Sequence, residues 1–233
     1  MKGLMFVFAA AVACAAAATP AFAASGTQAP PQAPAQAPAQ SSPAPANPWL
    51  AARGDPVKAQ PIVTSVCAAC HGADGNSAVP IYPNLAGQGY SYLLKQLNDF
   101  KSGKRQNPIM NGMVASLSED DMHNLAAYFS AQQMKPGTVQ HKQMAQAGQK
   151  LWRGGIASVG VPACESCHGP MGLGIPVEFP RLAAQHAQYV YAQLNNFRTG
   201  ARQNDPGKMM HTIAARLSDK DMLELSQYIR SLP

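Results

Sequence analysis

The sequence reads Cys-Ala-Ala-Cys-His-Gly at residues 67–72, and 97 residues later it reads Cys-Glu-Ser-Cys-His-Gly at residues 164–169. Cys-x-x-Cys-His is the attachment signature of c-type haem. Two thiols three positions apart can form thioethers with the two vinyl groups of a porphyrin, and the next histidine is then held under the iron. We therefore predict two covalently attached haem c groups, each bound by two cysteines and one histidine: Cys67, Cys70 and His71 in the first motif, and Cys164, Cys167 and His168 in the second.

Three other uses of these cysteines fit the pattern less well. A thioredoxin-like Cys-x-x-Cys needs no following histidine and opens a helix after a strand. A zinc site would need two more ligands at short spacing, and none follows either pair. Disulfides between the pairs would leave both histidines without a role.

The two motifs belong to a longer internal repeat, which indicates two homologous domains. The matching segments are residues 83–85 and 180–182, residues 92–100 and 189–197, and, after a three-residue insertion near 205–207, residues 117–122 and 217–222. We place the first domain at residues 49–138 and the second at residues 139–233.

Helical signals recur in both domains. Ser118 and Ser218 are predicted N-caps with Asp121 and Asp221 in capping-box position. The spacing of apolar residues after these caps predicts a last helix in each domain. Further helices are expected at residues 90–101, 186–198 and 145–152, and a distorted one at residues 58–66, which contain Pro61. No segment alternates as a strand does, so the predicted fold class is all-α.

The N-terminal residues have a different composition. Residues 1–23 combine Lys2, an uncharged apolar run and the ending Ala21-Phe22-Ala23, which is typical of a secretory signal peptide. An uncleaved anchor and lipidation at Cys14 are the alternatives. Residues 24–48 are a linker of Ala-Pro repeats, expected to be extended. We predict export to the periplasm, with attachment to a membrane surface left open, and no binding to nucleic acid.

The sixth iron ligand has several candidates. Met110 and Met210 lie at equivalent positions, seven residues before the helix-opening leucines, in segments expected to be irregular loops. A methionine sulfur there can reach the open haem face, and Met113 and Met209 are near competitors. The less favoured candidates are expected to be core residues (Met122 and Met222), structural or surface histidines (His186 and His211) and solvated histidines (His123 and His141).

These features resemble class I cytochromes c, specifically the dihaem cytochrome c4 family, from Trp49 to the end of the chain. The resemblance rests on residues 67–76, residues 83–88 and the two methionine segments. It implies two tandem class I domains, His/Met ligation through Met110 and Met210, and proline carbonyls that accept from the axial imidazoles. Those acceptors would be Pro83 and Pro180. The Gly-x-Gly-Lys start usual in the family is missing around Lys58, and the long Pro/Ala spacer is a second departure.

The expected function is electron transfer without catalysis, because the protein fills both axial positions of each iron. The resemblance implies a bacterial respiratory chain, with electrons passing from a quinol-oxidising complex (a quinol–cytochrome c reductase) to a terminal oxidase. The alternatives are the cytochrome subunit of a periplasmic dehydrogenase of the flavocytochrome type and a dihaem enzyme. Four basic residues near the second methionine segment are either a docking surface for an acidic partner or a solvated basic face: Arg198, Arg202, Lys208 and Arg216.

Overall fold

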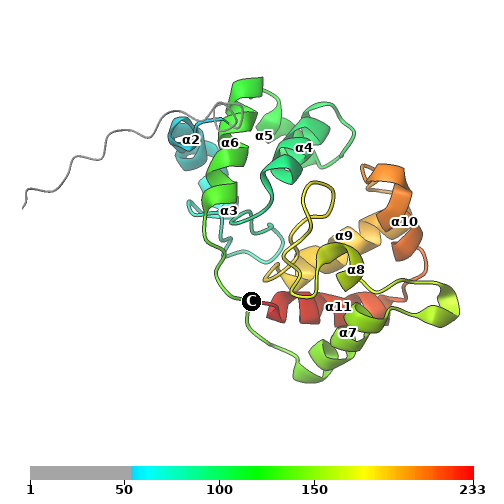
Figure 1. The fold of residues 1–233 in the computed structure, drawn as a ribbon. Helices are drawn as coiled ribbons and strands as arrows, with labels where there is room; N and C mark the ends of the chain where they lie inside the picture. Colours follow the sequence, from blue (N-terminus) through cyan, green and yellow to red (C-terminus); the bar gives the residue numbers. More distant parts are fainter. Residues whose placement is uncertain (1–53) are drawn as a thin grey trace, which may run out of the picture. The chain divides into compact units, whose positions relative to one another are not determined.

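Helices make up the regular structure of residues 54–233, the part of the chain that the computed structural model describes (Figure 1). In that part no strand forms, and two isolated β-bridges join Ile156 to Val161 and Ile175 to Phe179. The predicted all-α fold class is confirmed. The predicted signal peptide at 1–23, the linker at 24–48 and the first residues of the first domain, 49–53, lie outside the described residues.

In the first half, α2 and α4 pack against α6, as the cyan and green ribbons of Figure 1 show. The core between them contains Val63, Leu93, Phe100, Leu125 and Phe129. The elements are α2 (Pro56–Ile62), a π-helical turn (Val63–Cys67), α3 (Ala68–His71), α4 (Tyr90–Lys101), α5 (Pro108–Val114) and α6 (Glu119–Ala131).

In the second half, α7 and α9 pack against α11, and α10 packs against α9. Trp152, Val190, Met222, Leu225 and Ile229 belong to the core of this half. The elements are α7 (Lys142–Gly154), a 3-10 turn (Ala157–Val159), α8 (Glu165–His168), α9 (Ala187–Thr199), a second 3-10 turn (Pro206–Lys208), α10 (Met209–Ala214) and α11 (Asp219–Ser231).

The opening helix of the first half is distorted, as expected from Pro61. Proline has no N–H to donate to the preceding turn. The turn that follows widens to π geometry over Val63–Cys67, and the N–H of Ala68 donates to the carbonyl of Val63, five residues back. The helical path then continues into α3 and carries the chain directly to the first attachment motif.

The last helix of each half begins with the predicted cap. The hydroxyl of Ser118 accepts from the N–H of Asp121, and the Asp121 carboxylate accepts from the N–H of Ser118. Ser218 and Asp221 form the same pair at the start of α11. Both capping boxes are therefore confirmed.

The two methionine segments are short helices, so the prediction of irregular loops is wrong. Asn107 caps α5 by accepting from the N–H of Ile109 and of Met110, and Pro108 is the first helical residue. Both features favour a helix start. In the second half, α10 begins without such a cap, directly after Lys208, whose φ is 55°.

Replacing Gly148 by alanine is expected to destabilise the second half by about 2 kcal/mol, the usual cost of overpacking. A Cβ at Gly148 would lie 2.1 Å from the carbonyl oxygen of Glu224, where α7 crosses α11. Guanidinium unfolding followed by far-UV circular dichroism measures the change. Gly154→Ala is the matched control in the same helix, because no atom lies within 4 Å of the position that its Cβ would take. An equal loss in both variants would contradict the prediction.

Candidate functional site

The first attachment motif lies at the end of the helical path through residues 56–71. Cys67 closes the π-helical turn, and Cys70 and His71 lie in α3. The chain turns at Gly72, where φ is 77° and a Cβ would lie 2.6 Å from the carbonyl oxygen of Asn76. Nδ1 of His71 lies 2.9 Å from the carbonyl oxygen of Pro83, and the His71 side chain is buried. The positive φ and the close carbonyl of Asn76 therefore require glycine at position 72, directly after this histidine.

The second motif repeats this geometry. Cys164 precedes α8, which contains Cys167 and His168, and Gly169 follows with a φ of 80°. Nδ1 of the buried His168 lies 3.0 Å from the carbonyl oxygen of Pro180. Each half therefore presents two cysteines and one histidine whose ring is held by a proline carbonyl.

Both histidines are in the form that binds a metal ion. Burial lowers the pKa of His71 and of His168, and the hydrogen bond with the proline carbonyl only partly offsets this. The imidazoles are therefore neutral near pH 7. Because Nδ1 donates its proton to the proline, Nε2 carries the lone pair.

The cysteines fit thioether formation better than the other uses of such pairs. No disulfide joins any of the four cysteines in residues 54–233. Burial raises the pKa of Cys67 and of Cys164 to about 11, whereas reactive dithiols and zinc ligands need a lowered thiol pKa. Across the described residues, no three His, Cys, Asp or Glu side chains converge as a metal site. Two half-buried thiols and a neutral imidazole fit a covalently attached haem.

The candidate methionines differ in exposure. Met110 and Met210 are partly buried and pack against the cores of their own halves. Their competitors Met113 and Met209 are 46% and 40% exposed. Two further methionines, Met122 and Met222, are buried core residues, as the sequence predicts.

Three of the four other histidines have hydrogen-bond partners within the protein, and His141 is exposed, as the sequence predicts. His186 Nε2 lies 2.9 Å from the carbonyl oxygen of Ser77, His211 Nδ1 lies 2.8 Å from that of Phe197, and His123 Nδ1 lies 2.5 Å from the hydroxyl of Tyr90. The structural roles expected for His186 and His211 are consistent with these bonds. The prediction of a solvated His123 is wrong, because α6 holds it, half-buried, against the start of α4.

A polar cluster around two buried arginines joins the halves. Arg105 and Arg202 are 97 positions apart and equally buried. Each guanidinium contacts the glutamine of its own half and the tyrosine and glutamine of the other half, at 2.8–3.2 Å: Arg105 binds Gln96, Tyr189 and Gln193, and Arg202 binds Gln193, Tyr92 and Gln96. The repeat thus extends to the contact between the halves, through residues that the sequence did not predict.

The predicted basic docking surface is therefore wrong in part. Arg202 is buried in the cluster between the halves and cannot contact a partner. Arg198 forms an ion pair with Asp219 at 2.7 Å. Arg216 donates to the carbonyl of Gly160 at 2.8 Å.

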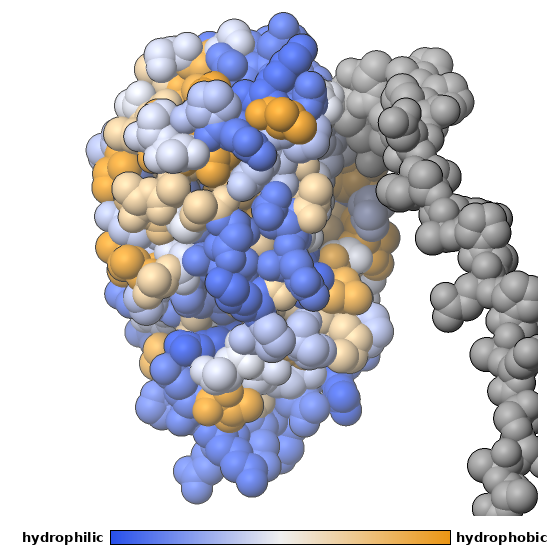
Figure 2. All heavy atoms as spheres, turned by 90° about the vertical axis from the view of Figure 1, so that its left-hand side faces the viewer, coloured by the Kyte–Doolittle hydropathy of each residue, from blue (hydrophilic) through white to orange (hydrophobic). Residues whose placement is uncertain are grey.

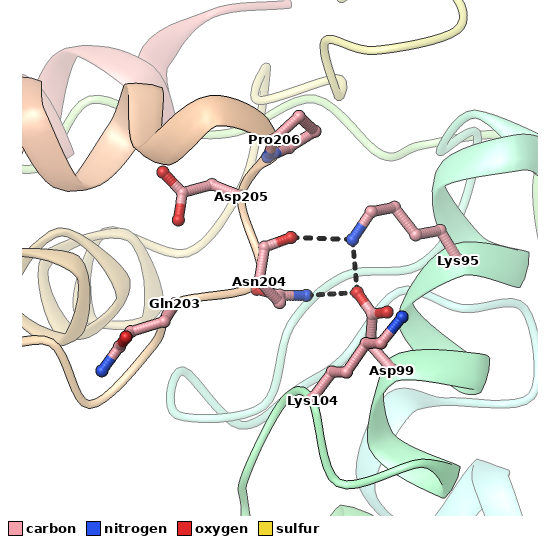
Figure 3. A pocket seen from close by; sticks show the side chains of 7 residues that line it. All are labelled: Lys95, Asp99, Lys104, Gln203, Asn204, Asp205 and Pro206. Atoms are coloured by element: carbon pink, nitrogen blue, oxygen red, sulfur yellow. Dashed lines mark hydrogen bonds and ion pairs between the residues drawn. The ribbon is translucent and has the colours of Figure 1, made fainter.

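Asn204, just before the three-residue insertion, reaches the first half (Figure 3). Its carbonyl accepts from Nζ of Lys95 at 2.8 Å, and its amide donates to the Asp99 carboxylate at 2.6 Å. Lys95 also pairs with Asp99. These residues line an open groove together with Lys104 and Asp205. The second half thus contacts the first through Asn204, in a segment that the sequence shows only as an interruption of the repeat.

The cluster has a positive potential that suits haem propionates. Burial alone would raise the pKa of Tyr92, but the charges of Arg202, Arg105 and Lys95 outweigh burial, so that the pKa of Tyr92 is lowered. Two buried guanidinium groups lie beside one carboxylate in this cluster, that of Asp99, which leaves positive charge to be balanced. Propionates are carboxylates, and the residues present therefore fit haem.

Comparisons with known proteins agree with this geometry. A profile of the family "Cytochrome c" matches residues 56–133 and 145–233. Cytochrome c4 of Pseudomonas aeruginosa is 49% identical over 183 residues, which cover 78% of this chain and 90% of that protein. The chain belongs to the cytochrome c4 family. The crystal structure of reduced recombinant cytochrome c4 from Pseudomonas stutzeri is 46% identical, with a TM-score of 0.74, and the match covers 77% of this chain and 100% of that chain.

Another relative has a name that refers to a partner. The "Thiosulfate dehydrogenase electron acceptor" of Stutzerimonas stutzeri is 40% identical over 169 residues, covering 71% of this chain and 78% of that protein. The protein whose sequence is printed above is, as a member of the cytochrome c4 family, an electron carrier and not an enzyme. It has two covalently attached haem c groups in tandem class I domains. No helix in residues 54–233 is long and apolar enough to cross a membrane.

Proposed function

We propose that each half holds one haem through two thioethers, a histidine and a methionine. The proposed ligands and attachment points are Cys67, Cys70, His71 and Met110 in the first half, and Cys164, Cys167, His168 and Met210 in the second. The observation that carries this proposal is the buried, neutral histidine tied to a proline carbonyl in both halves. The greater burial of Met110 and Met210 supports them over Met113 and Met209.

In this arrangement the haem, when bound, supplies a one-electron change of its iron. The protein's own residues limit the haem to this one-electron change. Pro83 and Pro180 fix the orientation of the two imidazoles. With His71 and Met110 on one iron and His168 and Met210 on the other, neither iron would have a position left for a substrate. The result is a carrier whose electrons enter and leave at the haem edges.

We propose that the protein works in the periplasm, in a respiratory chain between a quinol-oxidising complex and a terminal oxidase. The loops between each histidine and its proline support a docking role near the haems. They expose apolar side chains at Val79 and Ile81 in the first half and at Met171, Leu173, Ile175 and Val177 in the second. Such surfaces suit short-lived contacts with redox partners.

A second candidate is the electron acceptor of a periplasmic dehydrogenase. The relative named for thiosulfate dehydrogenase favours it. A stable subunit of such an enzyme would bury a large apolar surface. On the face shown in Figure 2, hydrophobic residues form small groups separated by hydrophilic ones, so this face does not present such a surface.

A spectroelectrochemical titration of the purified holoprotein tests the ligand proposal. Two low-spin waves at positive potential, with the sulfur-to-iron charge-transfer band intact, are expected. A high-spin haem, or a band that is absent at neutral pH, would contradict methionine ligation. Mixing the reduced protein with a terminal oxidase and oxygen, or the oxidised protein with a thiosulfate dehydrogenase and thiosulfate, distinguishes the two partner classes by the rate of electron transfer.

We also propose the chain division given above: a signal peptide at 1–23, a linker at 24–48, and domains at 49–138 and 139–233. The "Cytochrome c" matches at 56–133 and 145–233 lie within the two domain ranges and support them. Mass spectrometry of the exported protein is expected to give a chain that begins at Ala24 and carries two haems.

A further inference from the structure

Two buried glutamines connect the halves at equivalent positions. Gln88 and Gln185 are 97 positions apart and only 7% and 6% exposed. Oε1 of Gln88 accepts from the N–H of Arg181 at 2.9 Å, and its Nε2 donates to the carbonyl of Arg181 at 2.8 Å. Gln185 binds both backbone groups of Asn84 in the same way, at 2.9 and 3.0 Å.

The orientation of both amides is determined by their neighbours. Oε1 of Gln88 also accepts from the N–H of Gly89 at 2.9 Å, and Oε1 of Gln185 accepts from that of His186 at 3.0 Å. Two backbone N–H donors at one end of each amide identify that end as oxygen, since nitrogen there would face two donors. Each glutamine therefore presents an acceptor to the opposite half.

Each glutamine binds a peptide of the opposite half, and the carbonyl of that peptide holds the axial histidine of the opposite half. The N–H of Arg181 and the carbonyl of Pro180 belong to the same peptide unit, and that carbonyl lies 3.0 Å from Nδ1 of His168. A continuous path thus runs from His168 through one peptide to Gln88. The mirror path runs from His71 through the peptide between Pro83 and Asn84 to Gln185.

We propose that Gln88 is a positioning residue for His168, and Gln185 for His71, each acting on the haem of the opposite half. This inference rests on the proposed function, in which these histidines bind iron. An acceptor on a peptide N–H makes the carbonyl of that peptide a stronger acceptor. The imidazole that donates to this carbonyl becomes more basic and favours ferric iron. The contact between the halves therefore adjusts both reduction potentials.

The test is reciprocal and uses the full holoprotein. In Gln88→Leu, the Nδ1–H proton of His168 is expected to move upfield in the NMR spectrum of the reduced, histidine-labelled protein, and the reduction potential of the second haem is expected to rise. In Gln185→Leu, the same changes are expected at His71 and the first haem. The haem of the mutated half should keep its potential in each case, as followed by its own haem methyl resonances.

Gln96→Leu is the matched control. Gln96 is as buried as Gln88 and also bridges the halves, but its partners are side chains and it contacts neither proline peptide. Neither Nδ1–H resonance should move in this variant. The proposal is overturned if each glutamine variant affects its own half, if both halves respond alike, or if neither responds. Failure of the ligand proposal would be seen separately, as a wild-type protein without the sulfur-to-iron band.

Discussion

Replacing Met110 by histidine is expected to lower the reduction potential of the first haem by on the order of 0.2 V, a fraction of the roughly 0.8 V range that axial ligands cover. A thioether favours ferrous iron, whereas a second imidazole favours ferric iron. Met110 is partly buried and packs on the core of the first half, so the imidazole of the new histidine would begin at the same backbone position as the methionine side chain. The sulfur-to-iron band is expected to lose about half its intensity, because the second haem keeps its methionine. Spectroelectrochemistry measures both quantities.

Met113→His is the matched control for this prediction. Met113 lies one helical turn further along α5 and is 46% exposed. It should leave both waves and the charge-transfer band unchanged. If Met113→His removes the band and Met110→His does not, the assignment of the sixth ligand must be exchanged. Met210→His and Met209→His form the same pair for the second haem.

The local features of this fold could be predicted from the sequence. Capping boxes join residues three positions apart, and helix faces repeat within a few residues, so Ser118, Ser218 and the helices that they begin are visible in the chain itself. The attachment motifs are equally local. The helix around Met110 also has a local signal, because Asn107 and Pro108 are typical of a helix start.

The contacts between the halves could not be predicted in this way. Arg105 meets Tyr189, and Gln88 meets Arg181, across more than eighty positions of chain. Helical periodicity carries no information on such pairs, and an arginine is normally assigned to the surface. The repeat held one clue, since the residues of the contact recur at the same displacement as the haem motifs. Polar residues repeated without a local role are therefore candidates for a contact between repeats.

Replacing Trp152 by alanine is expected to destabilise the second half by about 3–5 kcal/mol, the usual cost of removing a buried tryptophan. Trp152 is fully buried, and its ring lies 5.9 Å from that of Tyr228 and 6.3 Å from that of His168. The cavity would lie where α7 packs on α11 and beside His168.

The loss is expected to appear as an earlier unfolding transition of the second half in guanidinium, followed by far-UV circular dichroism. The sulfur-to-iron band of that half should disappear in the same transition, because His168 loses the ring that packs against it. Leu223→Ala on α11 is the control, since Leu223 is 41% exposed and its truncation should change stability by less than about 1 kcal/mol. A loss in Trp152→Ala no larger than in this control would mean that the covalently attached haem, and not the packing of α7 on α11, holds the second half together.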